Sequence, residues 1–345
     1  MKYFSTEPYR KLGRAFNFII GGREVGKTFN SIYDAYHARE QFIFMRRTQD
    51  EIDLIASNDD DIELSPFAKI NERSKNPKYG LEPTNFFMKR INKKLWGVYN
   101  NREEPVKVGI MLALSTVASI RGFSASSYPV WIFDEFIPEQ HVRKIGKGDA
   151  EGTAFLQAYS TINRDREDEG LPPIQCFLLA NAVDIACPLL SVLGYTLDFE
   201  RMAKRGQHFR DIPERNTTLT LYDDVDAEER KKHRALYQLT VGTSFAKMAF
   251  DNDFAYNDFN LISSRPLKEF RPWCRIGDVC IYSHKAGEYF YASPHLMKCV
   301  EYGTHEQEID RFISERGRIL YGFYLQGNLI FENYTVKKKL LDIIL

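Results

Sequence analysis

The sequence has one segment whose residue types and spacing can bind phosphate. Residues 21–28 follow the pattern G-x-x-x-x-G-K-[ST]. Glycines let backbone N–H groups close around phosphate oxygens, and a helix that begins there adds the positive end of its dipole. In such a loop the lysine reaches the β- and γ-phosphates, and the threonine hydroxyl binds Mg²⁺. We therefore predict a nucleotide site formed by Gly21, Gly22, Arg23, Glu24, Val25, Gly26, Lys27 and Thr28, with Lys27 catalytic and Thr28 a metal ligand.

Two adjacent acids supply the chemistry that a phosphate loop alone lacks. Residues 130–133 are apolar and are followed directly by Asp134 and Glu135. Carboxylates in this position emerge at the carboxyl end of a buried strand, where open α/β sheets bind ligands. We expect Asp134 to hold Mg²⁺ and Glu135 to orient and deprotonate the attacking water. The second acid favours hydrolysis over phosphoryl transfer to a small molecule.

Other polar side chains are weaker candidates. Asn181 follows a third apolar run and suits either a contact to the γ-phosphate or an ordinary Asx turn. Arg164 and Arg166 lie between the acids and Asn181, Arg121 precedes Asp134 by 13 residues, and Arg23 lies within the loop. A guanidinium that stabilises transition-state charge distinguishes a fast ATPase from a slow switch. Each arginine also suits a plain surface position.

The elements around these motifs indicate an α/β fold. An apolar run over 16–20, a helical pattern over 27–40 and a second apolar run over 41–45 form a βαβ unit, which predicts a parallel sheet of the P-loop type. Residues 48–105 contain an acidic run at 58–61, which suits a solvated loop, and a hairpin pattern over 86–99. We expect this segment to be an insertion or an excursion from the sheet. We expect further strands over 108–114, 130–133 and 176–179 and a helix over 152–163.

The composition changes from about residue 195 onward. A charged run over 228–234 predicts an exposed helix, and residues 257–272 suit a linker. Beyond it, a hairpin pattern centred on 285–287, a helix near 306–316 and strands near 319–331 predict a second α/β unit. The acids Asp278, Glu288, Glu308 and Asp310 lie there, but their spacing does not indicate the convergence that a two-metal nuclease needs.

Composition restricts the class of protein. A length of 345 residues suggests about two domains, and 47 basic against 47 acidic residues exclude a uniformly basic coat for nucleic acid. Five scattered cysteines are typical of reduced intracellular thiols, and no apolar run is long enough to span a bilayer. A guanine-reading N-K-x-D motif is missing from the sequence, so ATP is the expected nucleotide.

With these motifs assembled, the chain resembles the DNA-packaging ATPases of protein-primed tailed phages, the phi29-type motors. The segments that carry the resemblance are FNFIIGGREVGKT at 16–28, QFIFMRR at 41–47, FDEFI at 133–137, NRDRE at 163–167, ANAV at 180–183, LYDD at 221–224 and GTSFAKMAFDNDF at 242–254. The resemblance implies an additional-strand, catalytic-glutamate ATPase domain over 1–195. It also implies a linker or lid domain over 196–256 and an RNase H-like domain over 257–345 without nuclease activity.

The resemblance also implies an assembly and its partners. Motors of this kind form homo-oligomeric rings, typically pentamers, that dock on the portal of a prohead in the host cytoplasm and pull double-stranded DNA inward. Whether a structural RNA takes part is left open. The family's arginine finger acts in trans and corresponds to Arg164, with Arg166 as the alternative, and Arg121 replaces a second trans-acting lysine. Other DNA-translocating P-loop ATPases, such as helicases, and a non-hydrolysing prohead component remain alternatives, and Glu135 argues against the latter.

Overall fold

The structure is a computed structural model that describes residues 4–23, 25–58, 60–117, 127–138, 150–182, 184–222, 238–239 and 261–345. The chain divides into two compact units. One contains Met1–Leu193 and Arg201–Tyr256, and the other contains Gly194–Glu200 and Asn257–Leu345. Each unit has its own sheet.

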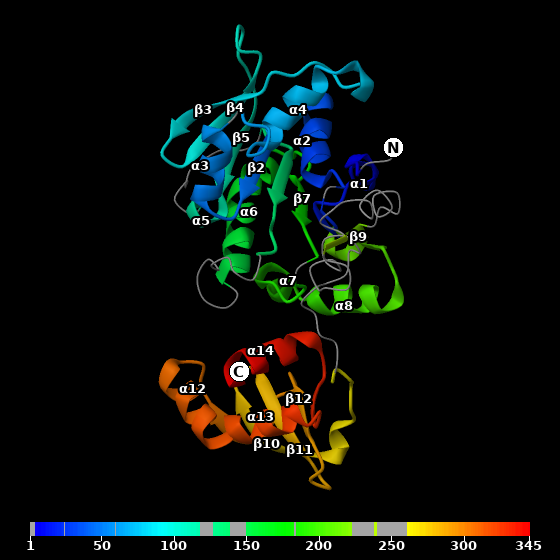
Figure 1. The fold of residues 1–345 in the computed structure, drawn as a ribbon, viewed down its shortest axis with the longest axis vertical. Helices are drawn as coiled ribbons and strands as arrows, with labels where there is room; N and C mark the ends of the chain where they lie inside the picture. Colours follow the sequence, from blue (N-terminus) through cyan, green and yellow to red (C-terminus); the bar gives the residue numbers. More distant parts are fainter. Residues whose placement is uncertain are drawn as a thin grey trace. The chain divides into compact units, whose positions relative to one another are not determined.

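The first unit is built on a sheet of nine strands in the order β3-β4-β5-β2-β6-β7-β1-β9-β8 (Figure 1). The six strands from β5 to β9 in this order are parallel, and β3, β4 and β8 are antiparallel additions at the two edges. Their bounds are β1 Phe16–Gly21, β2 Phe42–Arg46, β3 Phe87–Asn92, β4 Leu95–Asn100, β5 Val106–Ala113, β6 Val130–Asp134, β7 Gln175–Ala180, β8 Phe209–Ile212 and β9 Thr217–Tyr222.

The predicted βαβ unit is confirmed. β1, the helix α2 (Lys27–His37) and β2 follow one another, but β2 does not lie next to β1. Two strands from later in the chain, β6 and β7, are inserted between them. The strand that carries the two acids is therefore separated from the phosphate-loop strand by β7.

Helices cover both faces of this sheet and bury β1, β2 and β6 on both sides. Apolar side chains of α2, α3 (Gln49–Ser57) and α4 (Pro66–Ser74) form one core with Phe42, Phe44 and Ile132. The opposite face receives α6 (Ala150–Asp168), where Trp131 stacks on Tyr159 and Phe133 on Phe155. The predicted helix over 152–163 is thus present and longer than expected.

The segment over 48–105 extends the sheet instead of leaving it. After α3, α4 and a short 3-10 turn (Pro77–Tyr79), β3 and β4 form the predicted hairpin, and β4 pairs with β5. The α3 helix begins with a capping box between Thr48 and Glu51. Our expectation of an excursion was wrong for the hairpin, because β4 covers the β5 edge that would otherwise be unpaired.

The boundary predicted at residue 195 falls near short helices, α7 (Pro188–Leu193) and α8 (Thr196–Arg205). Beyond them β8 and β9 return to the first sheet, and β9 pairs in parallel with β1 from Phe16 to Gly21. Much of the predicted linker segment over 196–256, including 228–234 and the motif at 242–254, lies outside the described residues. A separate linker domain stays a prediction.

The second unit has a five-stranded sheet in the order β13-β10-β11-β12-β14, with α14 (Tyr334–Ile344) contributing Val336 and Leu340 to its core. Its strands are β10 Phe270–Ile276, β11 Val279–His284, β12 Phe290–Ser293, β13 Val300–Tyr302 and β14 Leu329–Phe331. The hairpin around 285–287 is confirmed. The prediction of strands near 319–331 is confirmed only for β14. Before it, α12 (Glu306–Phe312) continues through a π-turn (Ile313–Gly317) into α13 (Arg318–Leu325). Leu320 and Phe323 pack into the core from this helix.

Among the described residues, no helix combines the length and apolar composition that a membrane span requires. The five cysteines are free thiols, as the sequence predicted. Burial raises the pKa of Cys187 to about 12, so this thiol stays protonated and packs as a small apolar side chain.

Candidate nucleotide site

Four neighbouring parallel strands end at one edge of the first sheet and bring the predicted residues together. The strands are β2, β6, β7 and β1, and their carboxyl ends carry Arg46, Asp134–Glu135, Asn181 and Gly21–Thr28 respectively. Ligands of open α/β sheets bind at this edge. These side chains are far apart in sequence, and the parallel pairing of the strands gathers them.

Backbone geometry shapes the phosphate loop. A Cβ on Gly21 would come within 2.7 Å of the carbonyl oxygen of Tyr222, so β9 leaves room there for glycine only. Gly26, the N-cap of α2, has φ of +86°, which a residue with a side chain rarely adopts. Both glycines are therefore required by the turn from strand to helix, as the motif implied.

Lys27 is buried in this loop. Its Nζ donates to the carbonyl oxygens of Gly21 and Gly22 at 2.9 and 2.7 Å and lies 3.5 Å from Oδ1 of Asn181. The loop carbonyls thus hold the ammonium at the mouth of the turn. Asn181 is brought to the phosphate loop, which favours the functional reading of this residue over a bare Asx turn.

Thr28 and Asp134 are in direct contact. The Thr28 hydroxyl donates to Oδ1 of Asp134 at 2.9 Å, and Asp134 is 3% exposed. A hydroxyl and a carboxylate side by side are the oxygen donors that Mg²⁺ prefers. These two residues fit the metal site that the sequence predicted.

Glu135 follows Asp134 in an uncommon backbone conformation. Its φ is +58°, in the left-handed region where residues other than glycine are strained. The side chain is half exposed, whereas that of Asp134 is buried. The turn directs two consecutive carboxylates to different environments, one enclosed and one open to solvent.

Arg46 is a site residue that sequence reasoning missed. Its guanidinium lies 2.8 Å from Oδ2 of Asp134 and also forms an ion pair with Glu135. Burial works against the charge of Arg46, but the two carboxylates outweigh it and raise the pKa of the guanidinium. Arg46 therefore balances the negative charge of both acids. The only signal in the sequence was an arginine pair directly after an apolar run.

The next residue, Arg47, points to the other face of the sheet. Successive strand residues alternate between faces, so Arg46 shares a face with Asp134 and Arg47 faces α6. The Arg47 guanidinium forms a bidentate pair with Glu151 in the first turn of α6, at 2.5 and 2.8 Å, and both side chains are buried. One strand end thus contacts both the acids and α6.

The two candidate arginines of α6 differ in environment. Arg164 is exposed, whereas Arg166 is 6% exposed and its Nε donates to the carbonyl oxygen of Pro172 at 2.9 Å. Asn163 accepts from the backbone N–H of Ile174, which directly precedes β7. Arg164 therefore lies at the amino end of β7, opposite the edge that carries Asn181.

The remaining predicted residues contribute less. Arg23 is half-buried in the loop, and Val25 is buried and accepts a backbone hydrogen bond from Phe4 at 3.3 Å. Glu24 and Arg121 lie outside the residues that the structure describes. Their predicted roles stay predictions.

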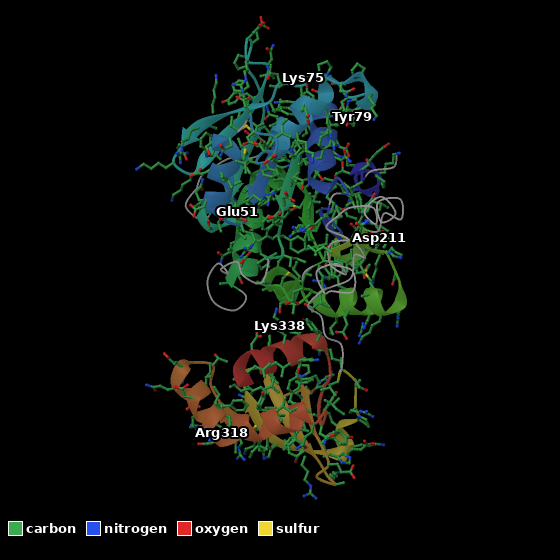
Figure 2. All side chains as sticks on the ribbon, viewed as in Figure 1. Glu51, Lys75, Tyr79, Asp211, Arg318 and Lys338 are labelled. Carbon is green, nitrogen blue, oxygen red and sulfur yellow. The ribbon has the colours of Figure 1, made fainter. Side chains whose placement is uncertain are left out.

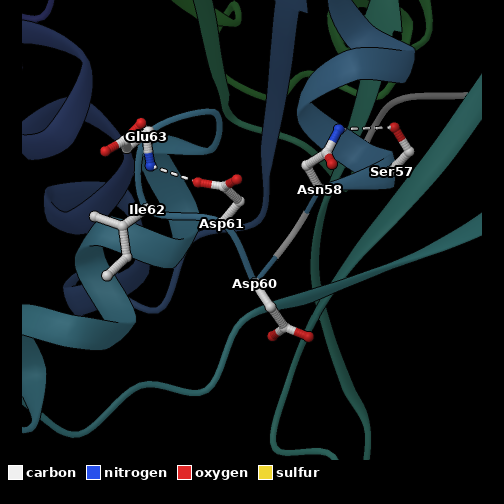
Figure 3. A pocket seen from close by; sticks show the side chains of 6 residues that line it. All are labelled: Ser57, Asn58, Asp60, Asp61, Ile62 and Glu63. Atoms are coloured by element: carbon white, nitrogen blue, oxygen red, sulfur yellow. Dashed lines mark hydrogen bonds between the residues drawn. The ribbon is translucent and has the colours of Figure 1, made fainter.

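A cavity of about 760 Å³ lies elsewhere in this unit, between α3 and α4 (Figure 3). The acidic run predicted as a solvated loop lines it, and Asp61 accepts from the backbone N–H of Glu63 at 2.9 Å. Asp60 pairs with Arg102. The cavity is at the C-terminal end of α3, the opposite end from Asp134 and Glu135. Among the described residues, no group of three or more side chains that could hold a metal ion occurs.

Comparisons with known proteins find relatives in sequence and in fold. Residues 101–270 match the family model described as podovirus DNA encapsidation protein (Gp16). The DNA packaging protein of Bacillus phage B103 is 25% identical over 256 residues, covering 73% of this chain and 68% of that protein. Two solved structures are similar in fold, both at 17% identity and each with 99% of this chain covered. The bacteriophage Phi-29 viral genome packaging motor assembly has a TM-score of 0.65 with 99% of its chain covered, and the Phi-28 gp11 DNA packaging motor has a TM-score of 0.56 with 97% covered. The chain is a homologue of the podovirus DNA encapsidation proteins.

Proposed function

We propose that this chain is the ATPase of a phage DNA-packaging motor and converts ATP hydrolysis into movement of double-stranded DNA into a prohead. The observation that carries the proposal is the cluster at the strand ends of a Gp16 homologue. There Lys27 lies in the phosphate loop and Thr28 contacts Asp134, beside Glu135. A helicase or DNA-transfer motor would need the same cluster but is not among the relatives found.

Each residue of the cluster has a role in this proposal. The loop N–H groups and Lys27 bind the β- and γ-phosphates of ATP. Glu135, open to solvent, accepts the proton of the attacking water. Asn181, 3.5 Å from Nζ of Lys27, contacts the γ-phosphate or that water. For Glu135 to act, its pair with Arg46 must open.

Mg²⁺ is part of the proposal, with Thr28 and Asp134 as its ligands. When bound, the ion neutralises charge that develops on the β- and γ-phosphate oxygens. Asp134 is already oriented by the Thr28 hydroxyl, so the protein does not have to reposition either oxygen donor. Arg46 compensates the Asp134 charge until the cation arrives.

We further propose that Arg164 acts on a neighbouring subunit in a homo-oligomeric ring. Arg164 lies at the amino end of β7, whereas the nucleotide site of the same subunit lies at the carboxyl end. A strand of β7's length spans about 20 Å, so Arg164 does not reach that site. Arg166 is a poorer candidate, since its side chain is buried and bonded within its own chain. Ring size, the prohead portal as docking site and location in the host cytoplasm are proposed from the resemblance alone.

The domain assignments also remain proposals. β7 lies between the phosphate-loop strand β1 and the acid-bearing strand β6, as expected for an additional-strand, catalytic-glutamate ATPase. In the second unit, the antiparallel run β10-β11-β12 with β13 parallel to β10 suits an RNase H-like sheet. β14 instead pairs with β12 at the other edge.

An ATPase assay with and without double-stranded DNA tests the proposed function. Wild-type protein should hydrolyse ATP and respond to DNA, and Lys27→Ala should lose hydrolysis because the ammonium that binds the phosphates is gone. Hydrolysis by Lys27→Ala at the wild-type rate would contradict the phosphate-loop assignment. The Arg39→Ala variant, which removes an exposed ion pair with Glu82, is a control that should behave like wild type.

Arg46→Ala should destabilise the nucleotide-free protein by about 3 kcal/mol, because Asp134 is left buried without its cation. Mg·ATP should restore much of this loss, since the metal takes over the charge compensation. Thermal unfolding with and without Mg·ATP measures both effects. The role assigned to Arg46 fails if the variant unfolds at the same temperature as Arg39→Ala.

A further inference from the structure

The β3–β4 hairpin carries a concentration of positive charge in a chain that is neutral overall. Residues 87–100 include four basic side chains and no acid. The basic residues lie within one continuous exposed stretch, 89–94, and the two-residue turn consists of Lys93 and Lys94. A cluster of positive charge of this density is typical of a surface that binds a polyanion.

The hairpin is a rigid support for these charges. Phe87 and Tyr99 stack across the two strands, and the Lys89 ammonium lies over both rings at 5.3 and 5.5 Å. On the other face Arg90 lies over Trp96 at 5.0 Å. The aromatic rings hold the charged ends of Lys89 and Arg90, so these two side chains are ordered beside the Lys93–Lys94 turn.

The turn lies at the same edge of the sheet as the catalytic acids. Trp96 pairs with Met111 on β5, and Ala113, two residues further along, is level with Arg46 on β2. The turn at 93–94 comes directly before Trp96 on the antiparallel strand. It is therefore level with the end of β2, where Arg46 contacts Asp134.

The α3 helix connects the hairpin to the catalytic strand. Asp53 accepts from Nε1 of Trp96 at 2.8 Å and pairs with Arg90 at 3.3 Å. α3 begins three residues after Arg46, which contacts both acids. A change at the acids has a short, hydrogen-bonded route to the hairpin.

We propose that the β3–β4 hairpin binds the phosphate backbone of double-stranded DNA through Lys93 and Lys94. This rests on the proposed function, which supplies duplex DNA as the polyanion. The hairpin would contact phosphates without reading the base sequence, because lysine ammonium groups on a turn recognise charge. It adds a DNA contact outside the nucleotide site, at the same ends of the strands as the acids.

Binding of a short labelled DNA duplex to the full chain, followed by fluorescence anisotropy over a series of salt concentrations, tests the proposal. Each phosphate contact contributes about 0.9 to the slope of log K against log salt concentration. Lys93→Ala/Lys94→Ala should therefore bind DNA more weakly at every sequence tested, with a slope smaller by about 1.8. A slope equal to that of wild type would overturn the proposal.

A matched control is available at the opposite edge of the sheet. Lys75 and Lys78 are exposed and follow α4, which is bonded to the start of β3 through Asn71 and Phe86. Figure 2 shows Lys75 and Tyr79 far from Glu51, which lies at the start of α3. Lys75→Ala/Lys78→Ala removes the same charge and should leave the slope unchanged. An equal loss in both variants would mean a general charge effect and would overturn the hairpin assignment.

Two further measurements separate the remaining outcomes. A charge-reversed Lys93→Glu/Lys94→Glu variant, verified by thermal unfolding, should weaken binding more than the alanine pair. Selective loss of binding to an RNA duplex, with DNA binding intact, would overturn the choice of DNA. If the wild-type protein neither binds DNA nor changes its rate of ATP hydrolysis with DNA, the proposed function itself is wrong. If the wild-type protein binds DNA and only the hairpin variants show no effect, the hairpin proposal alone is wrong.

Discussion

Glu135→Gln should bind ATP as wild type does and lose ATP turnover by at least about 100-fold, because an amide cannot accept the proton of the attacking water. The substitution preserves size and shape at a position whose left-handed backbone restricts the choice of residue. Its side chain is half exposed, so little stability is lost with the charge. Binding of a fluorescent ATP analogue and steady-state hydrolysis measure the two properties separately.

The control for this variant is a neighbouring acid with no catalytic role. Asp50→Asn changes an exposed carboxylate in the first turn of α3 in the same way and should keep ATP hydrolysis. If Glu135→Gln hydrolyses ATP at a rate similar to Asp50→Asn, then Glu135 is an ordinary acid at a strand end. Tight ATP binding with lost hydrolysis would instead assign the proton transfer to Glu135.

Arg164→Ala should reduce hydrolysis by about 10³- to 10⁵-fold in the assembled ring while ATP binding is kept, because the phosphate loop of the same subunit is intact. Arg166→Ala should have a different effect. Its guanidinium donates to Pro172 within its own chain, so its loss should lower the unfolding temperature more than that of Arg164→Ala. Hydrolysis, ATP binding and thermal unfolding of both variants distinguish a catalytic arginine from a structural one.

Mixing subunits tests whether Arg164 acts in trans. Arg164→Ala and Glu135→Gln are each inactive, but a mixed ring contains interfaces at which an intact Glu135 meets an intact Arg164. Partial activity should therefore return on mixing. Two inactive proteins that remain inactive together, with rings verified by sedimentation, would contradict the trans assignment.

Local pattern was sufficient for much of the fold. The strand over 16–20 and the helix that begins at Lys27 follow from an apolar run, two glycines and helical spacing, all within one short stretch of sequence. The hairpin at 87–100 was predicted for the same reason. The prediction of a strand where the structure has the helix Arg318–Leu325 was wrong, because a short apolar run with aromatic residues suits a strand as well as a buried helix face.

Strand order was the part that local pattern could not supply. Arg46 lies 88 residues before Asp134 in the chain, and the two meet because β2 and β6 are neighbours in the sheet. Local pattern also could not distinguish Arg164 from Arg166, since the packing of α6 determines which of the two is buried. The sequence was enough to propose individual site residues at strand ends, but only the order of the strands in the sheet shows which of these residues contact one another.

A DNA-protection assay tests the central claim most directly. Purified protein is mixed with proheads of its own phage, genomic double-stranded DNA and Mg·ATP, and the DNA that resists added nuclease is measured. We expect protected DNA with wild-type protein, and none when Glu135→Gln replaces it or ATP is omitted. Protection of DNA by Glu135→Gln to the wild-type level, or none with wild-type protein that hydrolyses ATP and binds the proheads, would contradict the assignment as the packaging motor.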